Sequence, residues 1–202
     1  MRLLVATSNR SKRAELERLF QGSGIELLVP PRELSVEESG ESFFQNAYLK
    51  ARAYYETFGV PALAEDSGLV VPALGGYPGI YSSRFYQLEW GGVEKVETSE
   101  KEANIKKLLR LMEGVHDRRA YFHSCVVLYM GNAGLWAEGR CDGEVLAEAR
   151  GEGGFGYDPV FRPEGHQRSM AELSPEEKDR ISHRGKAVRR LLKVLCGKSL
   201  EI

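Results

Sequence analysis

The sequence lacks the features that mark several common classes of protein. Its 202 residues include only three cysteines, which are scattered and match neither a zinc site nor a disulfide framework. Lysine and arginine number 28 against 29 acidic residues, so no overall field attracts nucleic acid or a membrane surface. The apolar run from Leu3 to Ala6 is too short for a signal peptide or a membrane span. We therefore expect a cytoplasmic protein that binds neither nucleic acid nor membrane.

Familiar catalytic motifs are missing as well. The sequence has no P-loop, no G-x-S-x-G nucleophile elbow, no Cys/His metal cluster and no internal repeat. The run Gly151–Gly156 matches the dinucleotide pattern G-x-G-x-x-G, but the Tyr157-Asp158-Pro159 that follows resists the helix which that pattern requires. Two interpretations stay open for this segment. Either Phe155 or Tyr157 stacks on a base, or the segment is a plain glycine-rich connection.

Two adjacent carboxylates, Glu65 and Asp66, lie between short apolar runs. Desolvating a charge is costly unless the charge is paired, so we expect a partner such as a metal cation. The pattern predicts a strand over residues 62–64, its end and a turn at 65–68, and its continuation over 69–71. The acidic loop over 35–41 is either a solvated surface or the source of a second ligand for the same cation.

The remaining pattern predicts an α/β fold with an antiparallel middle third. Strands are expected over 2–7, 25–29, 119–130, 135–141 and 144–149, with hairpin turns at 132–134 and 141–143. Capped helices are expected after Ser11, Ser42, Ser99 and Ser174, and a last helix is expected to end near Cys196. The strand-to-helix turn ending at Lys12 is either an anion site or a capped helix with a surface lysine.

Together these parts suit a nucleoside triphosphate. Mg²⁺ takes one or two carboxylates and fills its other positions with water and substrate phosphates. Lys12, Lys178 and Arg184 are separate cations for an anionic ligand. No side-chain nucleophile stands out, so the attacking group would be water, activated by the metal or by Asp66. His183 and Arg184 either bind a base edge or a phosphate, or are solvated.

Four sequence blocks carry a family resemblance. They are Thr7-x-Asn9-x-x-Lys12, Glu65-Asp66-Ser67-Gly68 followed by Ala73-Leu74-Gly75-Gly76-x-Pro78-Gly79, Gly153-Gly154-Phe155-Gly156-Tyr157-Asp158-Pro159, and Ser182-His183-Arg184. In their order and spacing they resemble the inosine triphosphate pyrophosphatase family across nearly the whole chain. The resemblance implies one elongated, two-lobed domain over residues 1–202, with a long mixed sheet, flanking helices and an active site in the cleft between the lobes. It also implies a homodimer.

The activity that the resemblance implies is Mg²⁺-dependent hydrolysis of ITP, dITP, XTP and dXTP to the monophosphate and pyrophosphate, which removes them from the nucleotide pool. Asp66 would be the general base and a metal ligand, and Glu37, with Glu38 as the alternative, would be the second metal ligand. His183 and Arg184 would meet the 6-oxo edge of the purine. The implied substrate-binding residues are Thr7, Ser8, Asn9, Arg10, Ser11, Lys12, Ser67, Phe155, Gly156, Tyr157, Asp158, Lys178, His183 and Arg184.

Two positions depart from the family pattern. Ser8 stands where many relatives have glycine, and Glu65 stands where many have aspartate. Two rival functions also stay open: a nucleotide-binding regulator without turnover, and a phosphohydrolase that releases orthophosphate. If Arg184 reads the base, its replacement by alanine should erode discrimination against ATP more than it erodes stability.

Overall fold

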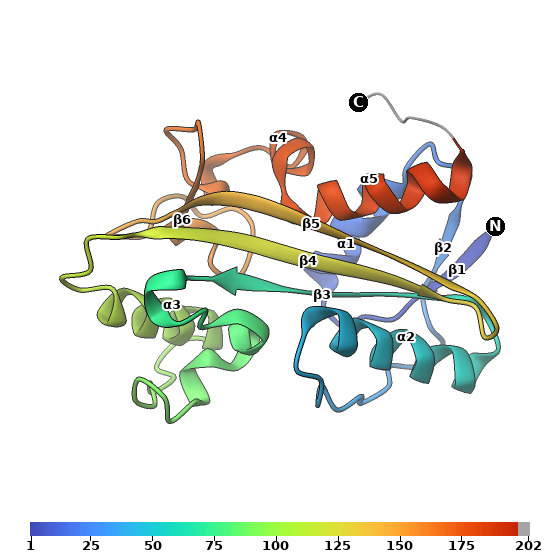
Figure 1. Ribbon diagram of the computed structural model, residues 1–202, viewed down its shortest axis with the longest axis horizontal. Helices are drawn as coiled ribbons and strands as arrows, with labels where there is room; N and C mark the ends of the chain where they lie inside the picture. The colour runs from blue at the N-terminus through green and yellow to red at the C-terminus, as the bar shows by residue number, and fades with distance from the viewer. Residues whose placement is uncertain (198–202) are drawn as a thin grey trace. The chain divides into compact units, whose positions relative to one another are not determined.

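The structure is a computed structural model that describes residues 1–197 (Figure 1). Its strands are β1 (Arg2–Val5), β2 (Glu26–Leu28), β3 (Ala62–Val70), β4 (Arg119–Tyr129), β5 (Gly134–Val145) and β6 (Phe161–Pro163). Its α-helices are α1 (Arg10–Phe20), α2 (Phe43–Phe58), α3 (Glu100–Leu111), α4 (Pro175–Ile181) and α5 (His183–Cys196). Short 3₁₀ segments are η1 (Pro72–Leu74), η2 (Gly79–Gln87), η3 (Asp158–Val160) and η4 (Met170–Glu172).

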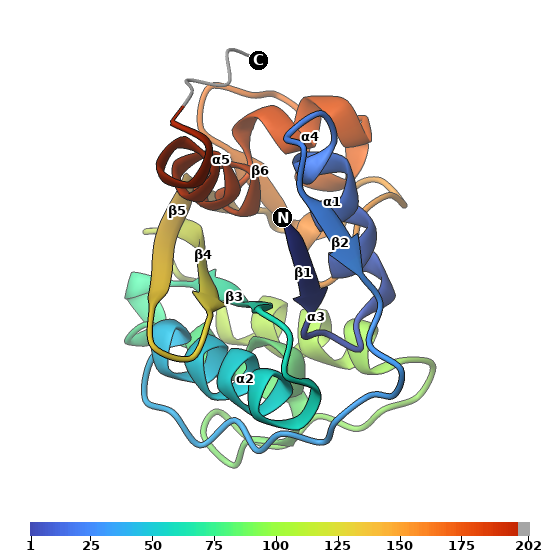
Figure 2. The ribbon, with the colours of Figure 1, turned by 90° about the vertical axis from the view of Figure 1, so that its right-hand side faces the viewer.

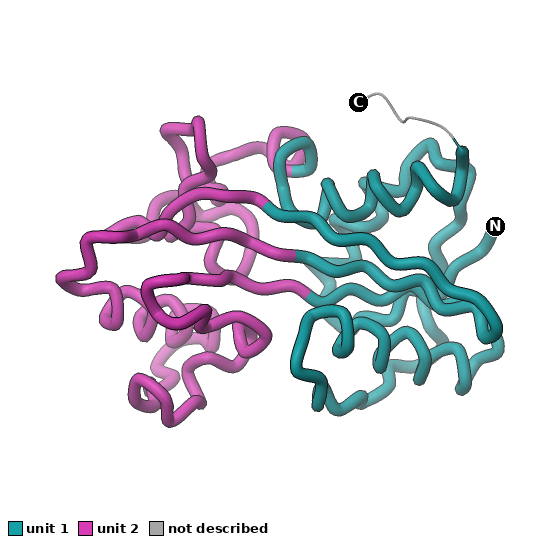
Figure 3. Tube along the Cα trace, viewed as in Figure 1, with its two compact units in different colours: residues 1–66, 124–140, 179–202 teal, residues 67–123, 141–178 magenta. Residues whose placement is uncertain are grey.

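The chain divides into two compact units, coloured separately in Figure 3. Of the described residues, unit 1 holds 1–66, 124–140 and 179–197, and unit 2 holds 67–123 and 141–178. The six strands have the order β2-β1-β3-β4-β5-β6. β1 pairs in parallel with β2 and β3, whereas β5 pairs antiparallel with β6. The predicted α/β fold with a mixed sheet and flanking helices is therefore confirmed.

Side chains alternate between the two faces of the sheet in unit 1. Leu3 and Val5 pack into a core shared with α1 and α5, whereas Leu4 and Ala6 pack into a second core shared with α2. Figures 1 and 2 show α1 and α5 over one face and α2 over the opposite face. Each buried leucine contributes roughly 1.5–3 kcal/mol. β1 is thus buried on both sides along most of its length, as a central parallel strand usually is.

The strand that carries the two carboxylates is longer than predicted. β3 runs without a break from Ala62 to Val70, so the predicted turn at residues 65–68 is wrong. Glu65 and Asp66 are both buried within it, at 2% and 5% exposure. Cationic side chains described below meet both carboxylates, and this compensation lets a strand carry two charges through the interior.

β5 also passes through a predicted turn. The prediction of a hairpin turn at residues 141–143 is wrong, because β5 is continuous from Gly134 to Val145. Gly143 pairs with Pro163 of β6, and a Cβ atom on it would overlap the carbonyl oxygen of Arg162. The glycine therefore permits a close approach of two strands. The other predicted hairpin, between β4 and β5, is confirmed by the bond from Met130 N to Ala133 O, at 2.9 Å.

Most helix starts match the sequence signals. The hydroxyls of Ser42, Ser99 and Ser174 each accept a backbone N–H three residues further on, at 3.1, 3.2 and 3.1 Å. Helix α1 differs, because the side chain of Asn9 caps it and accepts the N–H of Lys12 at 3.0 Å. The prediction that Ser11 caps this helix is wrong, since Ser11 already lies within the first turn.

Unit 2 is tied together by a buried lysine. Lys107 of α3 donates to the carbonyl oxygens of Phe85 and Leu88, at the end of η2, at 2.9 and 2.6 Å. Its ammonium group also lies 4.6 Å from the centre of the Phe85 ring. These contacts explain why a fully buried lysine is tolerated there.

No helix within residues 1–197 is long and apolar enough to cross a membrane.

Candidate active site

The two adjacent carboxylates of β3 serve opposite faces of the sheet. Successive residues of a strand point to opposite sides, so Glu65 follows Leu63 toward α1 and α5, whereas Asp66 follows Ala64 toward α2. The contacts agree: Glu65 meets Lys12 of α1, and Asp66 meets Lys50 of α2. The two carboxylates therefore do not act together as two ligands of one cation. Each carboxylate has its own ion-pair partner, although Lys12 is close enough to Asp66 to act on its charge as well.

Asp66 lies in a cluster with Glu38 and Lys50. The Lys50 ammonium lies 2.8 Å from Glu38 Oε1 and 3.6 Å from Asp66 Oδ1. It also donates to the backbone carbonyl of Glu65 at 2.9 Å. Lys50 thus bridges the acidic loop and the strand that carries Asp66. A cation placed between two carboxylates marks a position where positive charge is stabilised.

The acidic loop is held against α2 by two backbone hydrogen bonds. Gly40 N donates to Asn46 Oδ1 at 2.8 Å, and Glu41 N donates to Gln45 Oε1 at 2.7 Å. A Cβ atom on Gly40 would meet the Asn46 and Gln45 side chains at 2.7 Å, so the loop lies close to the helix. In this position of the loop, Glu38 contacts Lys50 and Glu37 is exposed. The structure thus brings Glu38, and not the favoured Glu37, to Asp66 through Lys50.

Burial controls the ionisation of this cluster. Burial raises the pKa of Asp66 above its ordinary value, and the ammonium groups of Lys50 and Lys12 oppose that shift. Burial also lowers the pKa of Lys50, but the carboxylates of Asp66 and Glu38 more than offset it, so the pKa of Lys50 is raised. The ionised form of Asp66 is therefore left short of compensation, and a further cation would stabilise it.

The donor set fits a hard divalent cation that also binds phosphate. Oδ2 of Asp66 is buried, and among the described residues no hydrogen-bond partner reaches it. Within residues 1–197, no three His, Cys, Asp or Glu side chains gather closely enough to hold a metal by themselves. Asp66 and Glu38 would supply two oxygen ligands, which suits Mg²⁺ because that ion normally keeps several positions for water and substrate oxygens.

Glu65 lies at the centre of the second cluster. Its Oε2 pairs with Lys12 Nζ at 2.9 Å, and its Oε1 accepts from Arg184 Nη2 at 3.1 Å. The same Oε1 accepts from Ser124 Oγ of β4 at 2.8 Å. Arg184 is 1% exposed, and its Nη1 pairs with the buried carboxylate of Glu15. Two carboxylates and two cations therefore alternate along one chain of contacts.

The alternating charges hold Arg184 firmly in its ionised form. Burial works against the charge, but the carboxylates of Glu65 and Glu15 outweigh it and raise the pKa of Arg184. Arg184 and His183 lie in the first turn of α5, and Ser182 Oγ caps that turn by accepting Gly185 N at 3.0 Å. Both side chains are buried, so the alternative that they are solvated is wrong.

The turn before α1 presents its residues on the surface. Ser8 and Asn9 are exposed, and Thr7 and Lys12 are partly exposed. Thr7 Oγ1 accepts Asn9 N at 3.2 Å. Arg13 Nη2 donates to Thr7 O at 2.9 Å and ties the turn to the helix. Arg10 and Ser11 are also exposed at this helix N-terminus, where the helix dipole favours an anion.

In unit 2, a buried ion pair orders the glycine-rich loop. Asp158 Oδ2 accepts Phe155 N at 2.9 Å and pairs with Lys178 Nζ at 2.7 Å. The Lys178 ammonium also lies 4.6 Å from the centre of the Phe155 ring. Gly154 has φ +65°, and a Cβ atom on it would overlap the Asp158 carboxylate. The loop therefore holds Phe155 in one place, as an aromatic platform requires.

Two predicted contact residues have other surroundings. Tyr157 is 3% exposed and donates its hydroxyl to Ser82 O at 2.8 Å, so of the two aromatic side chains considered for stacking on a base, only Phe155 is partly exposed. Burial raises the pKa of this tyrosine. Gly156 lies beside it with φ +58°, a conformation that favours glycine. Ser67 is half-buried within β3.

Sequence reasoning missed Lys50, Glu15 and Ser124. Periodicity alone marks Glu15 as an ordinary residue of the first turns of α1 and Ser124 as one position of a long strand. A signal did exist for Lys50. It lies four residues after Asn46 on α2, and this polar pair, which shares one helix face, meets the acidic loop.

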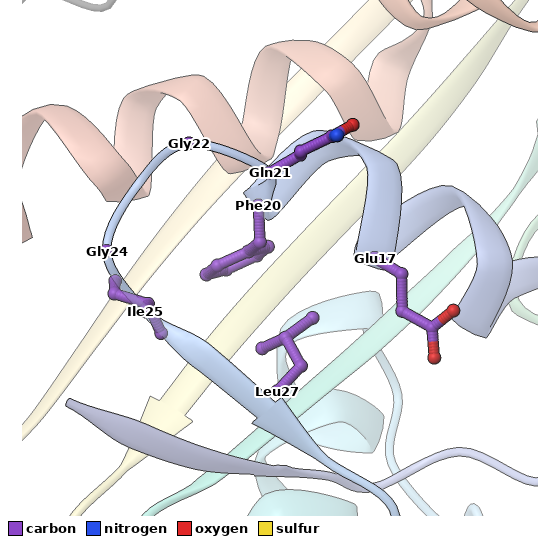
Figure 4. A pocket seen from close by; sticks show the side chains of 7 residues that line it. All are labelled: Glu17, Phe20, Gln21, Gly22, Gly24, Ile25 and Leu27. Atoms are coloured by element: carbon purple, nitrogen blue, oxygen red, sulfur yellow. The ribbon is translucent and has the colours of Figure 1, made fainter.

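A hollow of about 280 Å³ lies where the chain leaves α1 and enters β2 (Figure 4). Its lining residues are Glu17, Phe20, Gln21, Gly22, Gly24, Ile25 and Leu27. It contains none of the predicted site residues. One carboxylate, one amide and a few apolar side chains offer little with which to recognise a nucleotide.

Comparison with known proteins gives consistent results over nearly the whole chain. The model of the Ham1 family matches residues 3–194. A protein of Aquifex aeolicus named dITP/XTP pyrophosphatase is 56% identical over 195 residues, which cover 96% of both chains. One of the same name from Hydrogenobaculum is 42% identical over 202 residues, covering 93% of this chain and 95% of the relative. The solved structure of a HAM1 protein from Coxiella burnetii superposes with a TM-score of 0.83 at 38% identity, and covers 98% of this chain and 100% of that one.

Proposed function

This chain belongs to the Ham1 family, and from that membership we propose that it is a nucleoside-triphosphate pyrophosphatase that hydrolyses ITP, dITP, XTP and dXTP. The products would be the nucleoside monophosphate and pyrophosphate, so the enzyme would remove these purines from the nucleotide pool. The observation that carries the proposal is the buried Oδ2 of Asp66, which lacks a hydrogen-bond partner among the described residues, beside Lys50 and Glu38.

In the proposed mechanism, Asp66 acts on the attacking water. Its carboxylate accepts a proton from the water as the oxygen attacks the α-phosphorus. The bond from that phosphorus to the bridging oxygen breaks, and pyrophosphate leaves. Mg²⁺ held by Asp66 and Glu38 would neutralise charge on the phosphates. Lys12 and the N–H groups at the start of α1 would bind the phosphate chain, because both favour anions.

The purine would be held by residues already fixed in place. Phe155 would stack on the base, and its loop is ordered by the Asp158–Lys178 pair. His183 and Arg184 would meet the 6-oxo edge. Hypoxanthine and xanthine present an acceptor there, whereas adenine presents an amino donor that would leave a buried donor unpaired. Such a loss costs about 1–3 kcal/mol, or roughly fivefold to 150-fold in selectivity.

Two further properties form part of the proposal. We expect a homodimer in solution, as the family resemblance implies, and we expect the enzyme in the cytoplasm, where nucleoside triphosphates are made and used. Light scattering on the purified protein would give the mass of the assembly directly.

Product analysis tests the proposed reaction. The protein is incubated with dITP and Mg²⁺, and the products are separated by ion-exchange chromatography. We expect dIMP and pyrophosphate in equal amounts. Orthophosphate with dIDP would instead identify a phosphohydrolase of another type. Binding of dITP without turnover would identify a nucleotide-binding regulator.

The two neighbouring glutamates of the acidic loop form a matched pair for testing the metal site. Glu38→Gln should raise the Mg²⁺ concentration needed for half-maximal rate by about tenfold or more, because a carboxylate near Asp66 is lost. Glu37→Gln makes the same change one residue away, at an exposed position, and should leave that concentration within about twofold. The measurement is the rate of dITP hydrolysis as Mg²⁺ is varied. If Glu37→Gln has the larger effect, the assignment to Glu38 is wrong.

A further inference from the structure

The proposed reaction assigns no role to Glu65, although the carboxylate of this residue makes several polar contacts. It is 2% exposed, and its two oxygens divide their contacts between the interior and the edge of the substrate-binding turn. Oε1 is held from inside by Ser124 Oγ at 2.8 Å and by Arg184 Nη2 at 3.1 Å. Oε2 is turned toward Lys12 Nζ, 2.9 Å away. The carboxylate is therefore anchored on one side and presents its other oxygen to a lysine.

The lysine that it meets is the less buried partner. The side chain of Lys12 is 17% exposed, against 1% for that of Glu65. A lysine has a flexible four-carbon stem, so its ammonium group samples many positions unless something fixes it. In this pair the rigid partner is Glu65, because Ser124 and Arg184 hold it. The anchored carboxylate of Glu65 therefore fixes the position of the Lys12 ammonium group.

We infer that Glu65 is a positioning residue that orders Lys12 to receive the triphosphate of the substrate; this inference rests on the proposed function. An ammonium group has three N–H donors, so a contact with Glu65 leaves capacity for phosphate oxygens. The positive charge of Arg184 lies against the same carboxylate and offsets its repulsion of an anionic ligand. Glu65 can therefore direct the lysine without expelling the phosphates.

This role predicts a particular kinetic effect for Glu65→Gln. Losing the order of Lys12 weakens phosphate binding in the ground state and in the transition state alike. Such a loss raises KM and leaves kcat nearly unchanged. We expect KM for dITP to rise about tenfold and kcat to stay within about threefold. Inorganic tripolyphosphate, which has no base, should show a matching tenfold rise in its dissociation constant by calorimetry.

A double-mutant cycle separates positioning from general stabilisation. Lys12→Met removes the group through which Glu65 is inferred to act. In the Lys12→Met background, Glu65→Gln should then change the dissociation constant of tripolyphosphate by less than about twofold. An equal effect of Glu65→Gln in both backgrounds would overturn the inference. So would tighter binding of tripolyphosphate to the single Glu65→Gln variant, since that would mean that Glu65 competes with phosphate for the lysine.

A matched control and a conservative variant guard against loss of folding. Glu94→Gln makes the same change at a carboxylate in unit 2 that is 11% exposed and also pairs with a lysine and an arginine, Lys106 and Arg110. It should leave KM and tripolyphosphate binding unchanged. If Glu65→Gln does not fold, Glu65→Asp keeps the charge and withdraws it by one methylene, and should still weaken tripolyphosphate binding severalfold. Unchanged binding in folded Glu65→Asp would count against the inference.

The binding measurement does not depend on turnover. Wild-type protein that binds tripolyphosphate through this cycle but leaves dITP intact would disprove the proposed reaction alone. Wild-type protein that yields dIMP and pyrophosphate, yet shows additive effects in the cycle, would disprove the role of Glu65 alone.

Discussion

Replacing Asp66 by asparagine is expected to lower kcat for dITP hydrolysis about a thousandfold or more while the protein stays folded. A general base contributes about 10²–10⁴-fold to a rate, and this residue would also be a metal ligand. The amide of asparagine can neither accept the proton of water nor supply a negative charge to the cation. The measurement is kcat at saturating Mg²⁺, together with a thermal unfolding curve.

The stability of this variant should differ from that of most buried substitutions. The folded state raises the pKa of Asp66, chiefly through burial, so folding favours the protonated form. Such a group stabilises the fold fully only below its unfolded pKa, and that contribution is lost as the pH rises through the folded pKa. Above the folded pKa the ionised carboxylate therefore gives no net stabilisation. Because asparagine is neutral, we expect an unfolding temperature equal to or above that of the wild type.

Asp117→Asn is the control for this experiment. Asp117 is a carboxylate that Arg119 binds at the surface of unit 2, and that arginine holds its pKa at about 2. The substitution makes the same chemical change outside the site and should leave kcat unchanged. A folded Asp66→Asn protein with near-normal kcat would remove Asp66 from the role of base.

The second large effect concerns stability. Arg184→Ala is expected to lower the free energy of unfolding by about 3–5 kcal/mol, because it leaves two buried carboxylates, Glu15 and Glu65, without their shared partner. For a chain of this size that corresponds to a fall of roughly 6–20 °C in the unfolding temperature. The sequence alone led to the expectation that selectivity would suffer more than stability. Burial of Arg184 between two acids reverses that expectation.

Arg18→Ala supplies the comparison within unit 1. Arg18 pairs with Asp179 at 2.8 Å, but its side chain is 35% exposed, so its loss should cost less than about 1 kcal/mol. Arg184→Lys keeps the charge but cannot bind two carboxylates with a planar fork, and should lie between these limits. Both values come from denaturant unfolding curves. A cost of under 1 kcal/mol for Arg184→Ala would mean that the charged cluster does not stabilise the fold.

If Arg184 also meets the base, selectivity should respond in the variant that folds. The ratio of kcat/KM for dITP to that for dATP, measured on Arg184→Lys, reports this directly. A lysine in place of the fixed guanidinium would present its donor less rigidly, so the ratio should fall. Stability and selectivity thus share one residue, and the lysine variant allows both to be measured.

Much of the fold followed from local sequence pattern. The helix starts at Ser42, Ser99 and Ser174 were predictable because a hydroxyl and its backbone partner lie three residues apart. The two β strands that were predicted to break did not, because buried ion pairs and the close approach of β6 favour extended backbone there. Neither influence is visible within a short window of sequence.

By itself, the sequence determined the alternation of strands and helices, the caps, and the presence of two adjacent acids in an apolar setting. Only the tertiary structure decided what those acids meet. Because β3 is pleated, the side chains of Glu65 and Asp66 point to opposite faces of the sheet. Their partners come from distant segments of the chain, and Arg184, for example, lies 119 residues from Glu65. Periodicity depends on neighbours a few residues apart, whereas an ion pair depends on which elements pack together. That is why the sequence could mark the acids but could not assign Lys50 to one and Lys12 to the other.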